Sequence, residues 1–179
     1  FDEIKDDKRA KEYYSRGLEM YRRKEDVNAI AVITNNLGAV YEDLGELDSA
    51  LIFYHESLAI ALNHHLKNRE ADENLNIGSI HVKRGEYQKA LDYLLKAYEL
   101  DLRNNNESGI IETHTILGKA YLGLNRMNDA YAHLSRGLEL SLSKDTRELT
   151  CKLYLELGSY YYRLKDYKRA YDYHRMYTS

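Results

Sequence analysis

The chain has 179 residues, of which 44% are hydrophobic and 31% charged, enough for one domain with a sizeable core. Its net charge of −3 and its lack of long charged blocks argue against direct nucleic-acid binding, and no apolar run is long enough to span a membrane. The chain has no Pro and one Cys, Cys151, which favours a helical structure and excludes an internal disulfide.

Residues 1–26 are predicted to form a truncated repeat. Ala10 lies 40 residues before Ala50, in the register of the copies that follow. The first residue, Phe1, is not Met. We therefore expect the chain to be a fragment of a longer protein that opens partway through a repeat.

Three full repeats are predicted next, at residues 27–66, 67–106 and 107–146, and a last, truncated repeat at residues 147–179. The copies are marked by glycines spaced 40 residues apart: Gly38, Gly78, Gly118 and Gly158. A second set with the same spacing consists of alanines: Ala50, Ala90, Ala130 and Ala170. Two small-residue positions that hold one register over four copies indicate a repeat architecture within a single domain.

Each repeat shows two stripes of helical periodicity. In the first full repeat, one stripe runs from Leu37 to Leu44 and the other from Leu47 to Leu58. A tight turn at Gly45 separates them, and longer polar turns are expected between repeats, as at residues 63–68, 103–108 and 141–148. The prediction is an all-α solenoid of about nine antiparallel helices. The repeated glycines are expected where helices approach closely.

The order Leu-Gly, then Tyr three residues after Gly and Ala twelve after it, resembles the tetratricopeptide repeat. The usual repeat has a 34-residue period, against 40 here. The position where the family has Trp is filled by Thr34, Asn74, His114 and Tyr154. Repeats of this length resemble those of kinesin light chains, Pins-type spindle adaptors and bacterial Rap-type regulators.

The resemblance implies that the first helix of each pair lines a concave groove that binds a peptide or a partner protein. The groove residues expected from the register are Asn35, Asn36, Glu42, Asp43, Asp72, Asn76, Ser79, Lys83, Glu112, Lys119, Lys152, Tyr162 and Arg163. Asn36 and Asn76 share one register position and could bond the backbone of an extended peptide. The alternative is that each bonds within its own helix layer or to water.

Other polar groups receive structural interpretations. His64 and His65 are expected in a solvated turn, and His81 and His114 in the core. Cys151 is interpreted as a buried small side chain. Glu42 and Asp43 are interpreted as lying on a solvated helix face rather than as a catalytic pair. The sequence thus predicts no enzyme, no metal site and no cofactor.

Tyrosine is unusually frequent, with 18 residues. By register, Tyr154, Tyr161 and Tyr171 are expected in the core. The last helix has no following repeat to cover it, although terminal repeats need a polar outer face. We therefore expect either that a further helix follows or that this Tyr-rich end associates with a second copy.

The leading functional prediction is a non-catalytic protein–protein interaction module or scaffold. The alternative is the sensory or regulatory region of a bacterial signalling protein, coupled to a histidine kinase, a cyclase or a transcription regulator. The single cysteine is compatible with the cytoplasm. The alternative function would also allow the periplasm.

Overall fold

The computed structural model describes residues 2–178, with side chains from residue 9 onward, and this part of the chain forms nine α-helices. Their bounds are α1 Asp2–Arg23, α2 Val27–Asp43, α3 Leu47–Asn63, α4 Lys67–Lys83, α5 Tyr87–Asn104, α6 Glu107–Gly123, α7 Met127–Ser143, α8 Arg147–Arg163 and α9 Tyr167–Thr178. The prediction of an all-α fold is confirmed. Each range predicted as a full repeat contains one pair of helices.

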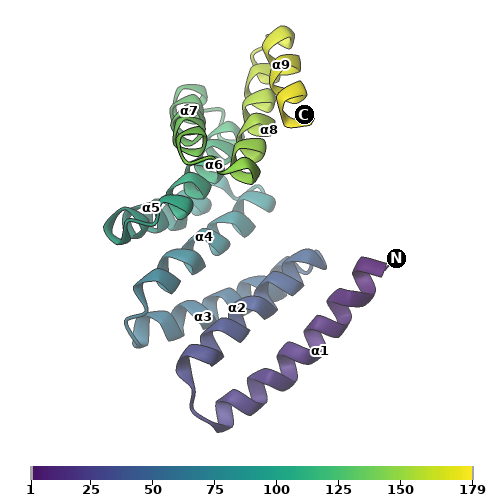
Figure 1. Ribbon diagram of the computed structural model, residues 1–179, viewed down its shortest axis with the longest axis vertical. Helices are drawn as coiled ribbons and strands as arrows, with labels where there is room; N and C mark the ends of the chain where they lie inside the picture. The colour runs from purple at the N-terminus through teal and green to yellow at the C-terminus, as the bar shows by residue number, and fades with distance from the viewer. Residues whose placement is uncertain (1, 179) are drawn as a thin grey trace.

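The helices stack in chain order, and each packs against the helices next to it in the sequence. The helices α4, α6 and α8, which are the first helices of their pairs, also pack on one another. Figure 1 shows the result as a curved stack whose two termini lie on the same side of the view. A chain of sequentially packed helix pairs is the expected solenoid.

Every turn contains one residue in the left-handed conformation. These residues recur every 20 positions: Glu25, Gly45, His65, Gly85, Asn105, Asn125, Asp145 and Lys165. The turns between repeats are therefore as short as the turns within them, and the expectation of longer turns was wrong. Because one left-handed residue is enough to reverse the chain, only three residues around His65 separate the end of α3 at Asn63 from the start of α4 at Lys67.

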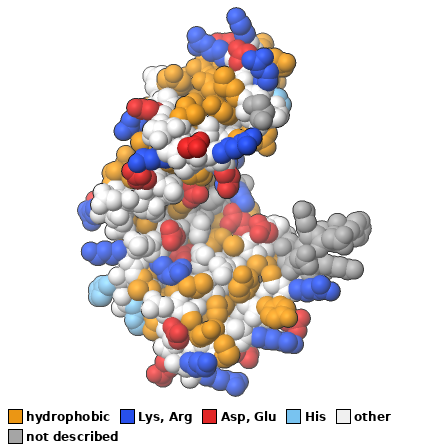
Figure 2. Space-filling model, viewed as in Figure 1, with side chains coloured by type: hydrophobic (Ala, Val, Ile, Leu, Met, Phe, Trp, Pro, Cys, Tyr) orange, Lys and Arg blue, Asp and Glu red, His pale blue; other side chains and the backbone are white. Residues whose placement is uncertain are grey.

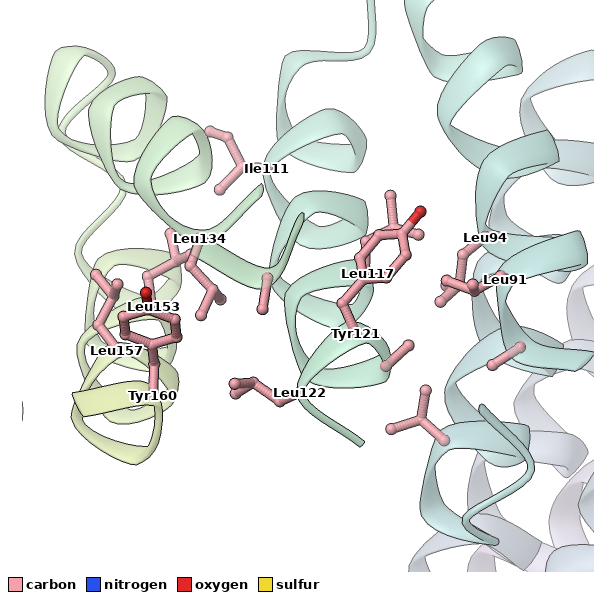
Figure 3. Packing of buried hydrophobic residues seen from close by; sticks show 14 of the residues in the cluster. Leu91, Leu94, Ile111, Leu117, Tyr121, Leu122, Leu134, Leu153, Leu157 and Tyr160 are labelled. Carbon is pink, nitrogen blue, oxygen red and sulfur yellow. The ribbon is translucent and has the colours of Figure 1, made fainter. Parts of the chain in front are cut away.

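The core lies between successive helices in two clusters, a larger one that runs from α4 to α9 and a smaller one between α3 and α4. In Figure 3, Leu117 and Leu122 of α6 lie between Leu94 of α5 on one side and Leu134 and Leu153 of α7 and α8 on the other. All five side chains are at most 2% exposed. The repeated apolar register thus provides each pair with a face for the next.

The repeated glycines let the two helices of a pair approach closely, as predicted. A Cβ added at Gly38 would lie 2.7 Å from the ring of Tyr54, and one at Gly78 would lie 2.7 Å from Leu94. Gly118 faces Leu134 in the same way. Gly158 differs, because the nearest atom to its added Cβ is the carbonyl oxygen of Ala170, at 3.6 Å.

Three predictions about buried residues were wrong, those for Tyr171, Cys151 and Tyr154. Tyr171 is 66% exposed, because no helix among the described residues lies over that side of α9. Cys151 is only half-buried and lines a surface hollow beside Tyr154 and Met176. Tyr161 is buried and Tyr154 half-buried.

Candidate functional site

The inner face of the solenoid, formed by α2, α4, α6 and α8, carries polar contacts between successive repeats. The side-chain amide of Asn76 on α4 lies 3.0 Å from the side-chain amide of Asn35 on α2, which is 41 residues earlier. Lys83 pairs with Glu42 at 2.7 Å with the same separation along the chain. These contacts fix neighbouring first helices side by side.

At the other end, Arg163 on α8 donates to the backbone carbonyl of Leu122 on α6 at 2.5 Å. Lys119 on α6 lies 3.3 Å from the Glu156 carboxylate on α8. The partners in these four contacts are 37 to 41 residues apart, close to the 40-residue period, so residues about one repeat apart lie beside each other on the inner face.

Two adjoining hollows of about 170 and 250 Å³ lie between α4, α6 and α8. We call them together the inner trough, because Ser79, Thr115, Ile116 and Lys152 line both. Its apolar lining consists of Leu75, Val82, Ile116, Leu149 and Leu155. Its polar lining is Asn76, Ser79, Lys83, Glu112, Thr115, Lys119, Lys152 and Glu156.

The inner trough carries charges of both signs, from three lysines and two glutamates. Burial raises the pKa of the Glu112 carboxyl, an effect that the nearby Lys152 opposes. Lys152 pairs with Glu148 at 2.7 Å on its own helix. An apolar floor with amide, hydroxyl and mixed charged groups can accept apolar side chains of a peptide while bonding its backbone.

A buried carboxylate lies behind the inner face. Glu73 on α4 is fully buried and accepts a hydrogen bond from the Ser57 hydroxyl on α3 at 2.6 Å. With its amide nitrogen turned toward Glu73, Asn35 on α2 donates to the carboxylate at 3.1 Å. Glu73 therefore joins three helices beneath the Asn35–Asn76 contact.

Burial raises the pKa of Glu73 to about 7, and Asp72 adds to the effect, while the bonds from Ser57 and Asn76 and the charge of Arg69 oppose it. A nearby phenol behaves similarly: burial, then the bond to Glu42, raises the pKa of Tyr54. Its hydroxyl donates to Glu42 at 2.6 Å. Glu42 is therefore held by two partners, the Tyr54 hydroxyl and the Lys83 ammonium. Its interpretation as part of a solvated helix face was wrong.

All thirteen residues predicted for the groove lie on α2, α4, α6 or α8. The structure brings six of them together around the inner trough: Asn76, Ser79, Lys83, Glu112, Lys119 and Lys152. Asn35 and Glu42 contact this group through Asn76 and Lys83. Asn36, Asp43 and Asp72 line neither hollow, and Tyr162 and Arg163 line a separate cavity at the C-terminal end.

The apolar residues Val82, Ile116 and Leu149 of the inner trough were not among the predicted groove residues. An apolar residue on a first helix outside its core stripe could have indicated Ile116, whereas Leu149 is itself part of the buried core. The register does indicate a core position for Glu73, since its register partners are Ile33, Thr113 and Leu153, but it does not indicate which groups would bond a carboxylate there. Its burial depends on Ser57 and Asn35 on two neighbouring helices.

The histidines expected in the core lie there. His81 stacks on Tyr93 with ring centroids 5.5 Å apart, and its Nδ1 lies 2.7 Å from Glu86. His114 lies 3.0 Å from His133 between their Nδ1 atoms, and burial, then the charge of His133, lowers the pKa of His114 to about 4. Within residues 9–178, no three His, Cys, Asp or Glu side chains are placed to hold a metal ion.

No helix in the described part of the chain combines the length and apolar character needed to cross a bilayer.

Structural comparison shows solved proteins with the same fold. BtubC (BKLC) from P. vanneervenii matches with a TM-score of 0.80 and 22% identity, over 96% of this chain and 72% of that one. The apo form of RapI matches with a TM-score of 0.76 and 18% identity, over 94% of this chain and 74% of that one. Aspartyl phosphate phosphatase F from Bacillus subtilis matches with a TM-score of 0.74 and 15% identity, over 99% of this chain but 45% of that one.

No curated protein matches the chain by sequence. Two family models, both described as tetratricopeptide repeat, match residues 30–65 and 75–108. The first matched segment covers most of α2 and all of α3, and the second covers most of α4 and all of α5. The chain therefore contains tetratricopeptide repeats at residues 30–65 and 75–108, and the same pairing of helices continues through α6–α9.

Proposed function

We propose that the chain is a non-catalytic protein-binding module that holds an extended peptide segment of a partner in the inner trough. The observation that carries this proposal is the trough itself, where six predicted groove residues surround an apolar floor between three helices. Asn76 and Ser79 would bond the peptide backbone, and Ile116 would contact its apolar side chains. Lys152 and Glu112 would select charged side chains of the peptide.

Rigid presentation of this surface would favour binding. The contacts of Asn35 with Asn76 and of Glu42 with Lys83 hold the first helices in place before a partner arrives. A pre-arranged surface lowers the ordering cost of association. The whole chain would act as one solenoid domain, with the last repeat truncated.

A blocking substitution tests the proposal. Ser79 lines both hollows, so Ser79→Tyr would fill the inner trough, whereas Ser135→Tyr places the same side chain on α7, outside it. Displayed random peptides would be selected on the wild-type chain and then measured by fluorescence anisotropy. We expect Ser79→Tyr to weaken binding at least tenfold and Ser135→Tyr to leave it unchanged. Equal binding by both variants would overturn the proposal.

The second candidate function is the regulatory region of a bacterial signalling protein. It is favoured by the likeness to aspartyl phosphate phosphatase F, of which the chain covers 45%, since this solenoid there forms part of a longer chain. Mixing the chain in solution with a phosphorylated response-regulator domain would distinguish the two candidate functions. Faster loss of the aspartyl phosphate would favour the regulatory function, and an unchanged rate would favour the binding module.

A further inference from the structure

Three polar side chains meet beneath the inner face where the first full repeat joins the second. One terminal atom of the Asn35 amide on α2 lies 3.0 Å from a terminal atom of the Asn76 amide on α4. The same atom of Asn35 lies 3.1 and 3.2 Å from the two carboxyl oxygens of Glu73. We call Asn35, Glu73 and Asn76 the Asn–Glu–Asn cluster. Because Asn76 also lines the inner trough, the cluster connects a buried carboxyl group to the candidate binding surface.

The repeat register does not require this cluster. At the junction of the second and third full repeats, the equivalent residues are Leu75, Thr113 and Ile116. At the following junction they are Thr115, Leu153 and Glu156. Neither set places a carboxyl group between two amides. The cluster is therefore a special feature of one junction rather than part of the repeat pattern.

With a proton on Glu73, one arrangement satisfies the whole cluster. The Glu73 hydroxyl donates to the Asn35 amide oxygen, and the Asn76 amide nitrogen donates to the same oxygen at 3.0 Å. The other carboxyl oxygen of Glu73 accepts the hydrogen bond of Ser57 at 2.6 Å. The Asn35 nitrogen then faces the amide oxygen of Asn36 at 3.5 Å. In this arrangement Asn76 leaves its amide oxygen, an acceptor, to the inner trough.

Loss of the proton makes this arrangement unfavourable. The Asn35 oxygen would face two carboxylate oxygens at 3.1 and 3.2 Å with no hydrogen atom between them. Turning over the Asn35 amide places its nitrogen there, where it donates to Glu73. That nitrogen then faces the Asn76 nitrogen at 3.0 Å, so the Asn76 amide has to turn over as well. After both changes Asn76 leaves its amide nitrogen, a donor, to the inner trough.

The surroundings of Glu73 place this change near neutral pH. Burial is the main reason that the pKa of its carboxyl group is raised to about 7. On the same helix, the charge of Asp72 also raises this pKa, whereas the charge of Arg69 lowers it. A pKa near 7 means that a small change of pH around neutrality moves Glu73 between its two states.

The helices packed against α4 contribute neutral or acidic groups to this region. Helix α2 contributes the neutral Asn35, and α3 contributes the Tyr54 phenol and the Ser57 hydroxyl, whose bond lowers the pKa of Glu73. Helices α5 and α6 contribute Asp101 and Glu112, and the charge of Asp72 raises the pKa of both carboxyl groups. Figure 2 shows several Asp and Glu side chains over the middle of the molecule on the face in view. Acidic surroundings of this kind do not offset the cost of burying another negative charge.

We propose that the Asn–Glu–Asn cluster is a proton-operated switch that sets the hydrogen-bonding character of the inner trough at Asn76. With Glu73 protonated, Asn76 accepts a hydrogen bond from a peptide N–H. When Glu73 gives its proton to water, Asn76 instead donates to a peptide carbonyl. The effect on binding rests on the proposed function of the inner trough, whereas the two arrangements of the cluster do not.

Nuclear magnetic resonance tests the switch without any peptide. In the intact chain labelled with nitrogen-15, the side-chain amide signals of Asn35 and Asn76 should shift together with pH, with one common midpoint near pH 7. Asn74 is the internal control, because its amide donates to the backbone carbonyl of Glu70 at 2.6 Å, and its signal should not follow this titration. Signals of Asn35 and Asn76 that stay constant through neutral pH, or that titrate with separate midpoints, would overturn the switch.

Glu73→Gln is the decisive variant, since its amide nitrogen can donate to Asn35 as the protonated carboxyl group does. It should abolish the titration of both Asn signals, whereas Glu99→Gln, at an exposed site on α5, should leave the midpoint unchanged. Ser57→Ala should move the midpoint to higher pH, because the bond from Ser57 lowers the pKa of Glu73. A titration that persists in Glu73→Gln, or a midpoint that Ser57→Ala does not move, would contradict the proposal.

Peptides selected on the chain at about pH 5.5 test the effect on binding. Methylation of one backbone nitrogen at a time removes single N–H donors from the peptide. At one position it should weaken binding at least tenfold at about pH 5.5 and clearly less at about pH 8.5, and in Glu73→Gln the loss should be equal at both. An equal loss at both pH values in the wild type would show that the switch does not act on the inner trough. Unchanged binding by Ser79→Tyr would overturn the proposed function alone, because the amide signals are measured without a peptide.

Discussion

The Lys83 ammonium of α4 and the Glu42 carboxylate of α2 lie 2.7 Å apart, and this pair joins two first helices that are otherwise held mainly through α3. Glu42 also accepts the hydrogen bond of the Tyr54 hydroxyl, whose side chain is 2% exposed. The carboxylate therefore satisfies a buried phenol and an inner-face cation at the same time.

The two members of this pair should differ in their contribution to stability. Glu42→Ala leaves the buried Tyr54 hydroxyl without its acceptor, so we expect the free energy of unfolding to fall by about 1–3 kcal/mol. Lys83→Ala removes a half-exposed partner, and its cost should be about 0–1 kcal/mol. Urea unfolding followed by circular dichroism measures both. Equal losses would show that the bond to Tyr54 adds nothing.

Two glycines at the same register position should respond to alanine with opposite signs. Gly78→Ala forces a methyl group against the buried Leu94, and we expect a loss of about 1–3 kcal/mol in the free energy of unfolding. Gly158→Ala meets no close atom and should gain about 1 kcal/mol from the better helix propensity of Ala. Thermal unfolding of the two variants provides the comparison. A loss at both positions would contradict the open geometry around Gly158.

Glu73 should make stability depend on pH. Its pKa is about 7 in the folded chain against an ordinary 4.5, so between these values the folded state holds a proton that the unfolded state has released. The free energy of unfolding should therefore fall with rising pH in this range, by up to about 1.4 kcal/mol per pH unit. Glu73→Gln, which mimics the protonated side chain, should remove this contribution.

The measurement is the difference in unfolding free energy between Glu73→Gln and the wild type, from pH 4.5 to 8. Taking this difference isolates the contribution of Glu73 to the pH dependence of stability from the contributions of other groups. His114 is one such group, because its lowered pKa favours the folded state as pH rises. The difference should grow up to about pH 7 and then level off. Glu99→Gln, at an exposed site on α5, is the control for the substitution of a glutamate by glutamine.

Lys165 should be replaceable by glycine with a gain in stability. Its φ of 61° is costly for a residue with a Cβ, by about 1–2 kcal/mol. We expect Lys165→Gly to raise the free energy of unfolding by about 1 kcal/mol, and Lys168→Gly, inside α9, to lower it by a similar amount. Both variants lose the same charge. A loss at both sites, measured by thermal unfolding, would argue against strain in this turn.

Sequence reasoning predicted the helices and their pairing because the 40-residue register is visible in Gly38, Gly78 and Gly118 themselves. It failed on the turns between repeats, where the left-handed residues are His65, Asn105 and Asp145 rather than glycine. Nothing in the type of residue at these sites separates them from an ordinary polar loop. The short reversal emerges only from the packing of the flanking helices.

The candidate site was predicted in part. The helices that carry the groove residues follow from the register, which is why Asn76, Ser79 and Lys152 all line the inner trough. The register places Glu73 at a core position, but the partners of its carboxylate were not predictable, since Ser57 and Asn35 lie on two other helices. The core prediction for Tyr171 failed because the register alone does not show how much of a position is covered: its register partner Leu91 is 3% exposed, whereas Tyr131 is 43% exposed.

The left-handed residues at positions 25 to 165 divide the polypeptide into segments of equal length, each a helix followed by one reversal. A chain partitioned in this way can gain or lose 40 residues without altering the backbone geometry of any remaining segment. Duplication or deletion of a helix pair would then change the length of the solenoid in fixed increments, while the sequence pattern of each helix and turn stays the same.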